Sequence, residues 1–130
     1  MDDTVAVVEG LHADLATWLG SPAPQEVFDR FAAAQHAQFS MVTTAGEVLD
    51  RAELLTGLHG ARNAQPGLTI TISDIEELIR DSGTIVVRFR EEHRVADTRT
   101  ARWVTAVLHV GPDEHIRWRS VQETWIPAGR

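Results

Sequence analysis

Residues 84–95 alternate with a period of two, a pattern typical of a β-strand with two different faces. One face is apolar until it ends in an acid and an imidazole, and it consists of Ile85, Val87, Phe89, Glu91, His93 and Val95. The other face is mainly charged, with Val86, Arg88, Arg90, Glu92 and Arg94. Because the period of two places Glu91 and His93 on the same side, we predict that this strand forms the wall of a pocket.

Three segments before this strand show helical patterns. From residue 3 to residue 19 apolar side chains recur every three or four positions, and a glycine follows as a stop signal. After a proline-containing break, residues 25 to about 36 predict a second helix. Residues 51 to about 59 predict a third, because Asp50 and Glu53 have the spacing of a capping box.

The remaining patterns predict β-strands. Residues 39–44 and a short arm at 47–49 flank a glycine turn, and residues 68–79 predict a strand that continues through a bulge. Turn signals then separate residues 84–95, 99–110 and 115–126. Helices followed by four long antiparallel strands predict an α+β fold, in which a strongly curved sheet closes around the helices as a cone with an open mouth.

Length and charge narrow the class of protein. A chain of 130 residues predicts a single domain spanning residues 1–130. The formal net charge of -7 argues against a nucleic-acid or anionic-membrane partner, because both are negatively charged and bind positively charged protein surfaces. The sequence has no run of about 18 apolar residues and begins without the positive flank of a signal peptide, so we expect a cytoplasmic protein.

Three missing residue types restrict the chemistry further. All 12 basic residues are Arg, and the chain contains neither Cys nor Tyr. This composition excludes a lysine Schiff base, a thiol nucleophile, a phenol proton donor and a thiolate metal site. The His residues lack metal-binding spacing, so we expect no metal and no cofactor. Any reaction depends on His, Asp, Glu, Arg, Ser, Thr or bound water.

The order of elements carries a family resemblance. Phe39-Ser40-Met41-Val42-Thr43 leads through Gly46-Glu47-Val48-Leu49-Asp50-Arg51 into a helix, and residues 118–125, from Trp118 to Trp125, close the chain. This arrangement resembles the nuclear transport factor 2-like (NTF2-like) superfamily, in particular its SnoaL-like branch. The resemblance implies a cystatin-like α+β cone with three N-terminal helices packed on a strongly curved antiparallel sheet, a hydrophobic pocket between them and, usually, a dimer.

The resemblance transfers few catalytic residues. Ketosteroid isomerases and scytalone dehydratases of this superfamily rely on Tyr, which this chain lacks. Its epoxide hydrolases use an Asp, Arg, Asp relay, to which Glu91 and Arg102 are the nearest counterparts without a matching motif. The SnoaL-like polyketide cyclases need only an acid or base in an apolar cavity, and this sequence meets that requirement.

Glu91 and His93 are the candidate catalytic residues. A carboxylate and an imidazole in an apolar pocket can exchange protons near neutral pH, although the same strand end could instead lie in solvent at the rim of the cone. His36 is a candidate for orienting a substrate oxygen, with the alternative that it stabilises the end of the second helix. We expect His12 on the exposed side of the first helix.

The sequence does not decide which face of the last two strands points into the cavity. Their candidate ligand-binding residues are Arg102, Trp118, Ser120, Gln122 and Glu123. If the face with Trp118 lines the cavity, Ser120 and Gln122 are its polar contacts; if the opposite face does, Glu123 is the candidate acid. Both faces of the strand at residues 99–110 are semi-apolar, as in a sheet covered by helices on one side and by a second subunit on the other, so we expect a homodimer.

Two functions are consistent with these patterns. The first is a cofactor-independent isomerase, polyketide cyclase-like enzyme or dehydratase that acts by acid–base chemistry on a small apolar metabolite. The second is a non-catalytic ligand-binding or assembly module on the same fold, because one fold serves many functions.

Overall fold

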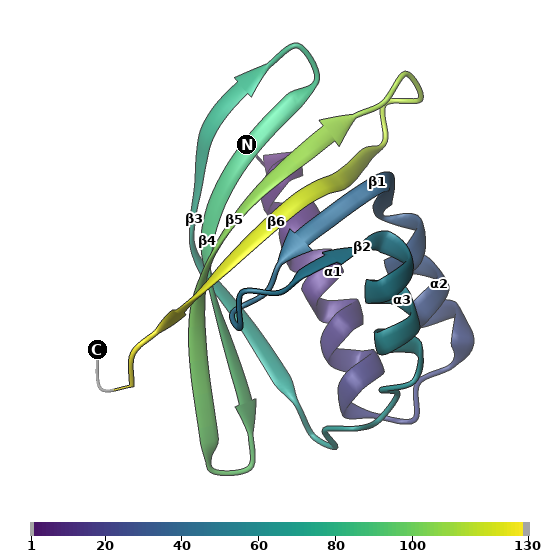
Figure 1. The fold of residues 1–130 in the computed structure, drawn as a ribbon, viewed down its shortest axis with the longest axis vertical. Helices are drawn as coiled ribbons and strands as arrows, with labels where there is room; N and C mark the ends of the chain where they lie inside the picture. Colours follow the sequence, from purple (N-terminus) through teal and green to yellow (C-terminus); the bar gives the residue numbers. More distant parts are fainter. Residues whose placement is uncertain (1, 129–130) are drawn as a thin grey trace.

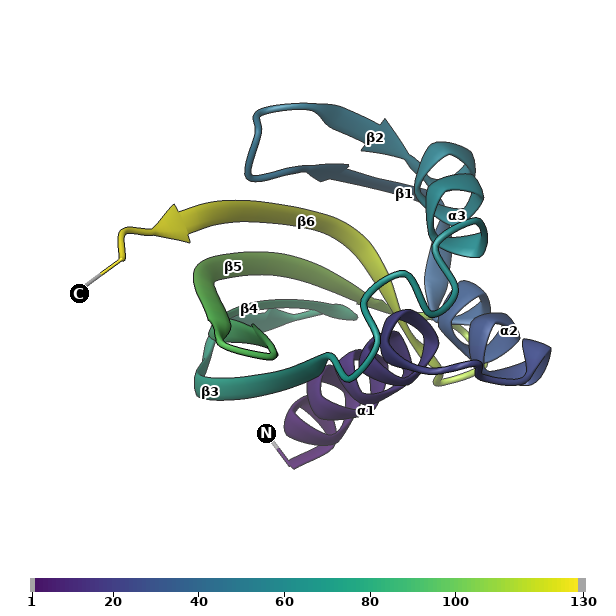
Figure 2. The same cartoon turned by 90° about the horizontal axis from the view of Figure 1, so that it is seen from below.

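Three helices lie in the hollow of one curved six-stranded sheet in the computed structural model, which describes residues 2–128 (Figures 1 and 2). The elements are α1 (Asp2–Gly20), α2 (Gln25–Ala33), β1 (Gln35–Val42), β2 (Val48–Asp50), α3 (Arg51–His59), β3 (Thr69–Asp81), β4 (Thr84–Val95), β5 (Thr98–Val110) and β6 (Ile116–Ile126). The predicted α+β cone is confirmed. Within the described residues, no helix has the length and apolar character needed to cross a membrane.

The sheet has the strand order β2-β1-β6-β5-β4-β3. Strands β3 to β6 form the predicted antiparallel meander, and β2 pairs back on β1 as the predicted short arm. However, β1 runs parallel to β6, so the sheet is mixed and not wholly antiparallel. No hairpin joins these two strands, and a long connection leaves their relative direction to tertiary packing.

The second helix ends earlier than its sequence pattern predicts. It stops at Ala33, and the chain enters β1 at Gln35. At this point the chain contacts the last strand, where the backbone N–H of Trp118 donates to the carbonyl of Ala34 over 2.8 Å. In contrast, α3 begins with the predicted capping box: the Asp50 carboxylate accepts from the Glu53 amide at 2.8 Å, and the Glu53 carboxylate accepts from the Asp50 amide at 3.0 Å.

Bulges break the regular alternation of the sheet in several of its strands. In β3 the register shifts between Ser73 and Glu76, where Asp74 adopts a left-handed backbone with φ of 54°. This shift confirms the predicted continuous but bulged strand. In β6, Ser120 lies opposite Val107 while Trp118 lies opposite Leu108, so the intervening Arg119 is an extra residue. Beyond such a bulge, each side chain points to the face opposite the one that a simple alternation would give it.

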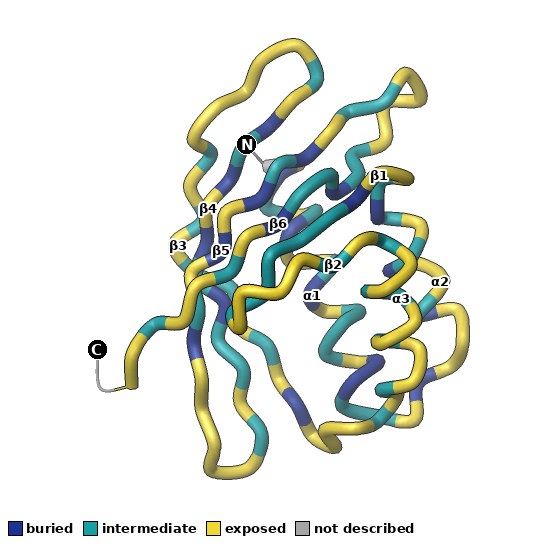
Figure 3. Tube along the Cα trace, viewed as in Figure 1, coloured by how far each residue is buried: buried dark blue, intermediate teal, exposed yellow. Residues whose placement is uncertain are grey.

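The buried core lies between the helices and the concave face of the sheet (Figure 3). Its main cluster consists of Val8, Phe39, Ile85, Val87, Phe89, Val104, Ala106, Leu108, Trp118 and Val121. Full burial of a side chain such as Phe89 contributes about 1.5–3 kcal/mol to folding. At the end of α1, a Cβ on Gly20 would lie 2.9 Å from the amide nitrogen of Leu68. The glycine therefore allows the helix end to approach the segment that leads into β3.

Candidate functional site

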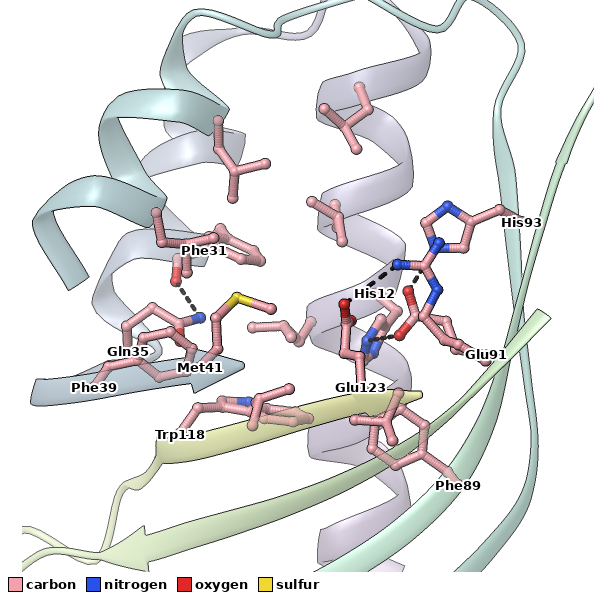
Figure 4. A pocket seen from close by; sticks show the side chains of 18 residues that line it. His12, Phe31, Gln35, Phe39, Met41, Phe89, Glu91, His93, Trp118 and Glu123 are labelled. Carbon is pink, nitrogen blue, oxygen red and sulfur yellow. Dashed lines mark hydrogen bonds and ion pairs between the residues drawn. The ribbon is translucent and has the colours of Figure 1, made fainter. Parts of the chain in front are cut away.

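A cavity of about 210 Å³ lies between the helices and the concave face of the sheet (Figure 4). Most of its wall is apolar, with side chains from all three helices and four strands, among them Leu11, Phe31, Met41, Leu58, Phe89 and Trp118. The wall also includes a polar cluster of five residues, His12, Glu91, His93, Arg102 and Glu123. An apolar cavity with a few convergent polar groups is the usual form of a small-molecule site.

Glu91 is the most deeply buried member of this cluster, with only 3% of its surface exposed. Its Oε2 lies 2.5 Å from Nε2 of His93, and its Oε1 lies 3.1 Å from Nε2 of His12. The period of two along β4 places Glu91 on the same inner face as Phe89 and His93. Both carboxylate oxygens of Glu91 are thus held by imidazoles.

His12 connects α1 to this carboxylate. Its Nδ1 lies 2.7 Å from the carbonyl oxygen of Val8, which can only accept, so Nδ1 carries a hydrogen. A proton must therefore lie between Nε2 of His12 and Glu91. Burial by itself would lower the pKa of His12, but its hydrogen bond to Glu91 and the charge of that carboxylate outweigh burial and raise the pKa. The raised pKa favours the charged form of His12 beside the Glu91 carboxylate.

The pKa of Glu91 moves in the complementary direction. Burial alone would raise the pKa of Glu91, yet the hydrogen bonds from His12 and His93 outweigh it and hold the pKa well below its usual range. Our expectation that His12 is exposed is wrong. It follows buried Val8 by four positions, a spacing that places both side chains on one helix face and that could have predicted its burial.

Glu123 and Arg102 form a second pair in the cavity wall. Nη1 of Arg102 lies 3.3 Å from Oε1 of Glu123, and the guanidinium carbon lies 4.6 Å from the centre of the Trp125 ring. Burial and then the charge of Glu91 raise the pKa of Glu123 against the opposing effect of Arg102. This carboxyl therefore binds a proton more readily than Glu91 does.

The bulge in β6 decides which residues of the last strand line the cavity. Trp118 faces inward before Arg119, whereas Val121 and Glu123 face inward after it. Ser120 and Gln122 therefore lie on the outer face, opposite Val107 and Thr105 of β5. Neither of the two simple alternations considered for this strand is correct along its whole length. On β5 the inward set contains Arg102 and Val104.

His36 also lies away from the cavity. It is the second residue of β1, and its ring centre lies 5.3 Å from that of His109 on β5. Its Nδ1 accepts a hydrogen bond of 2.9 Å from the backbone of Gln38. The structure thus brings five of the sequence-derived candidates together at the cavity, namely Glu91, His93, Arg102, Trp118 and Glu123, and leaves out His36, Ser120 and Gln122.

The chemistry of this arrangement is proton exchange. Nε2 of His93 is bonded to Glu91, and its Nδ1 makes no hydrogen bond with other residues of the described range 2–128. An imidazole oriented by a carboxylate can transfer a proton to or from a molecule in the cavity. Within the same range, no group of three or more His, Cys, Asp or Glu residues is arranged to hold a metal ion.

Comparisons with solved structures confirm the resemblance seen in the sequence. An NTF2-like protein of unknown function from Pseudomonas aeruginosa is 29% identical, with a TM-score of 0.88 over 92% of this chain and 95% of the other. A putative ketosteroid isomerase from Parabacteroides distasonis is 13% identical, with a TM-score of 0.70 over 96% of this chain and 86% of the other. ActVI-ORFA from Streptomyces coelicolor is 15% identical, with a TM-score of 0.71 over 95% of each chain.

These likenesses define the architecture of the protein. No protein-family model and no curated protein sequence matches the chain. The chain has the NTF2-like, cystatin-like α+β fold, and its structural neighbours include proteins of unknown function. A shared fold of this kind does not fix a reaction, which has to be argued from the site.

Proposed function

We propose that the protein binds a small, mainly apolar metabolite in this cavity and catalyses a cofactor-independent acid–base reaction on it. The reaction class is isomerisation, cyclisation or dehydration, each of which needs protons to be moved between positions of one molecule. The observation that carries the proposal is the position of the Glu91–His93 pair and of Glu123 on the wall of one apolar cavity. The structural likeness to a putative ketosteroid isomerase supports it.

In this proposal the polar residues have separate roles. His93 exchanges a proton with the substrate, since its Nδ1 is not engaged by the described residues. Glu91 is a weak base because two imidazoles hold its oxygens, so it orients His93. Glu123, with its raised pKa, supplies or accepts the second proton, and Arg102 stabilises negative charge on a substrate oxygen.

The test is proton exchange on a panel of cyclic ketones. In heavy water, the wild-type protein should exchange the hydrogens next to the carbonyl, followed by NMR, faster than buffer alone. His93→Gln and Glu91→Gln should each lower the rate about 100-fold or more, the range expected for loss of general acid–base catalysis. His115→Gln, at an exposed position before β6, is the matched control and should leave the rate unchanged. Equal rates in the wild type and both site variants would refute the catalytic role.

A second candidate function is a non-catalytic ligand-binding module. Both carboxylate oxygens of Glu91 already have imidazole partners. A purely structural ion pair would have the same arrangement, so this observation supports the module. A module would bind the same ketones and raise the melting temperature without accelerating exchange. Binding together with wild-type exchange rates equal to buffer would select this function.

We also propose a homodimer formed through the outer face of the sheet. Trp103 on β5 is 40% exposed, and its neighbours across the strands are Thr124 of β6 and Arg90 of β4. Together with Val107, this tryptophan makes the outer face semi-apolar, which favours coverage by a second copy. Sedimentation velocity should show a dimer for the wild type and a monomer for Trp103→Arg. A monomeric wild type at micromolar concentration would contradict this proposal.

A further inference from the structure

Gln35 is the only amide side chain among the residues that line the cavity, and it is deeply buried. It is the first residue of β1, and only 4% of its surface is exposed. The other lining residues supplied by α2, β1 and α3 are all apolar: Phe31, Phe39, Met41, Leu54 and Leu58. Glutamine is mostly found at the surface, because its amide needs hydrogen-bond partners once it leaves water. A buried amide in an apolar wall therefore calls for an explanation.

The orientation of this amide follows from its hydrogen bond. Nε2 of Gln35 donates to the carbonyl oxygen of Phe31 over 3.3 Å. A carbonyl oxygen only accepts, so the NH2 group faces Phe31 and Oε1 takes the other position. The same carbonyl already accepts from the backbone N–H of Ala34 at 3.2 Å. The end of α2 therefore does not need Gln35 to satisfy its carbonyl group, and support of the helix does not by itself explain the amide.

Oε1 of Gln35 is an acceptor that the protein leaves open. Among the described residues, two buried side-chain atoms are both unpaired and fully enclosed, Nε of Arg102 and Nε1 of Trp118. Oε1 of Gln35 also makes no hydrogen bond to the described residues, but it is not enclosed in this way, so part of its surface stays accessible. Figure 4 shows the side chain extending from β1 into the cavity. A molecule bound there can therefore reach this oxygen.

This acceptor lies apart from the acid–base pair. In the sheet, β6 and β5 lie between β1, which carries Gln35, and β4, which carries Glu91 and His93. Figure 4 shows Gln35 on one side of the cavity and the acid–base pair on the other. A ligand whose reacting group contacts His93 therefore brings a different part of its skeleton to Gln35.

The surroundings of Oε1 select a neutral hydroxyl group. An acceptor needs a donor, so carbonyl and ether oxygens do not satisfy it, and a carboxylate repels it. An ammonium group can donate, but the lining residues from α2, β1 and α3 include no carboxylate to balance its charge, and burial of an unpaired charge is costly. A hydroxyl group donates to Oε1 and brings no charge into the apolar wall.

We propose that Gln35 is a specificity-determining residue whose amide oxygen accepts a hydrogen bond from a hydroxyl group of the ligand. The ligand is then an apolar cyclic ketone that carries a hydroxyl group on the part of its skeleton remote from the carbonyl. This inference rests on the proposed function and specifies its substrate class. His93 contacts the reacting end of the molecule, and Gln35 selects the other end.

The test measures dissociation constants for the whole chain by NMR titration. The probes are 1-decalone, its 5-, 6- and 7-hydroxy derivatives, and the corresponding diones, in which a carbonyl replaces the hydroxyl. At least one hydroxy ketone should bind about tenfold more tightly than 1-decalone, because a buried acceptor gains a donor, and its dione should not. If 1-decalone binds and no hydroxy ketone binds more tightly than its dione, the ligand class is wrong and the proposed function stands. Absence of binding by every probe would overturn both.

Matched variants assign the preference to Gln35. Gln35→Met keeps the length of the side chain and removes the amide, so the tenfold preference should disappear while 1-decalone still binds. Gln38→Met, at an exposed position of the same strand, should keep the preference. A preference that persists in Gln35→Met would overturn the proposal.

A second measurement covers the case in which Gln35→Met does not fold. Nitrogen-15 spectra of the wild type report on the side-chain NH2 group of Gln35, whose signals respond when the amide oxygen accepts a hydrogen bond. These signals should shift further with the tightest-binding hydroxy ketone than with 1-decalone. Identical shifts at saturation with both probes would contradict a hydrogen bond to Gln35 and overturn the proposal.

Discussion

Glu91 and Glu123 lie in the wall of one cavity, yet their surroundings act on them in opposite directions. Glu91, on β4, is the more buried of the two, but imidazoles on both of its oxygens lower its pKa. Glu123, on β6, is half-buried with one guanidinium contact at 3.3 Å, and burial with the charge of Glu91 raises its pKa. The number and position of hydrogen-bond partners thus outweigh the depth of burial.

This contrast supports the proposed acid–base function. Two carboxyls with separated proton affinities can take different roles in one reaction, one kept ionised and one able to exchange a proton. The helices and strands that supply their hydrogen-bond partners decide which carboxyl stays ionised and which exchanges a proton. His12 on α1 and His93 on β4 act on Glu91, whereas Glu123 meets Arg102 on the neighbouring strand β5.

The largest expected effect is on stability. Glu91→Ala should lower the free energy of unfolding by about 3–5 kcal/mol, because it removes one partner of a buried charge pair and leaves His12 without a counter-charge. Glu123→Ala is the comparison and should cost less, because its pair with Arg102 is partly exposed. Urea unfolding at pH 7 measures both values. An equal or larger loss for Glu123→Ala would reverse the difference inferred between the two carboxyls.

The next effect is a change of stability with pH. The folded-state pKa of His12 is raised above its usual 6.5, so its contribution is fully present below pH 6.5 and is lost as the pH rises through the folded-state pKa. Urea midpoints of the wild type should therefore fall as the pH rises above 6.5. His12→Gln should flatten this fall, and His115→Gln, with its exposed imidazole, should retain it. A fall of the same size in His12→Gln would show that another group causes it.

The smallest expected effect is on the titration midpoints of the two carboxyls. Carbon-13 spectra of the side-chain carboxyls should show Glu123 titrating above its usual value of 4.5 and Glu91 remaining ionised well below that value. In His12→Gln the Glu91 midpoint should rise, because one of the two imidazole contacts that lower its pKa is lost. Coincident midpoints for the two carboxyls in the wild type would contradict the environments described above.

Much of this fold follows from local patterns. The capping box at Asp50, the bulged strand predicted over residues 68–79 and the two faces of residues 84–95 all depend on residues close together in the chain, and the structure contains each of them. The candidate site was harder to predict from the sequence. The sequence marks Glu91 and His93 because they share one strand face, but no local pattern pairs either residue with a helix near the N-terminus.

The sequence by itself determined the element types, the inner face of β4 and the absence of Lys, Cys and Tyr, which restricts the site to imidazole, carboxylate and guanidinium chemistry. Tertiary structure decided the parallel pairing of β1 with β6, the bulge at Arg119 that turns Glu123 inward, and the contact of His12 with Glu91. The physical reason is the range of the interactions. Periodicity and capping act within a few residues, whereas these three features depend on segments that meet only when the helices pack into the curved sheet.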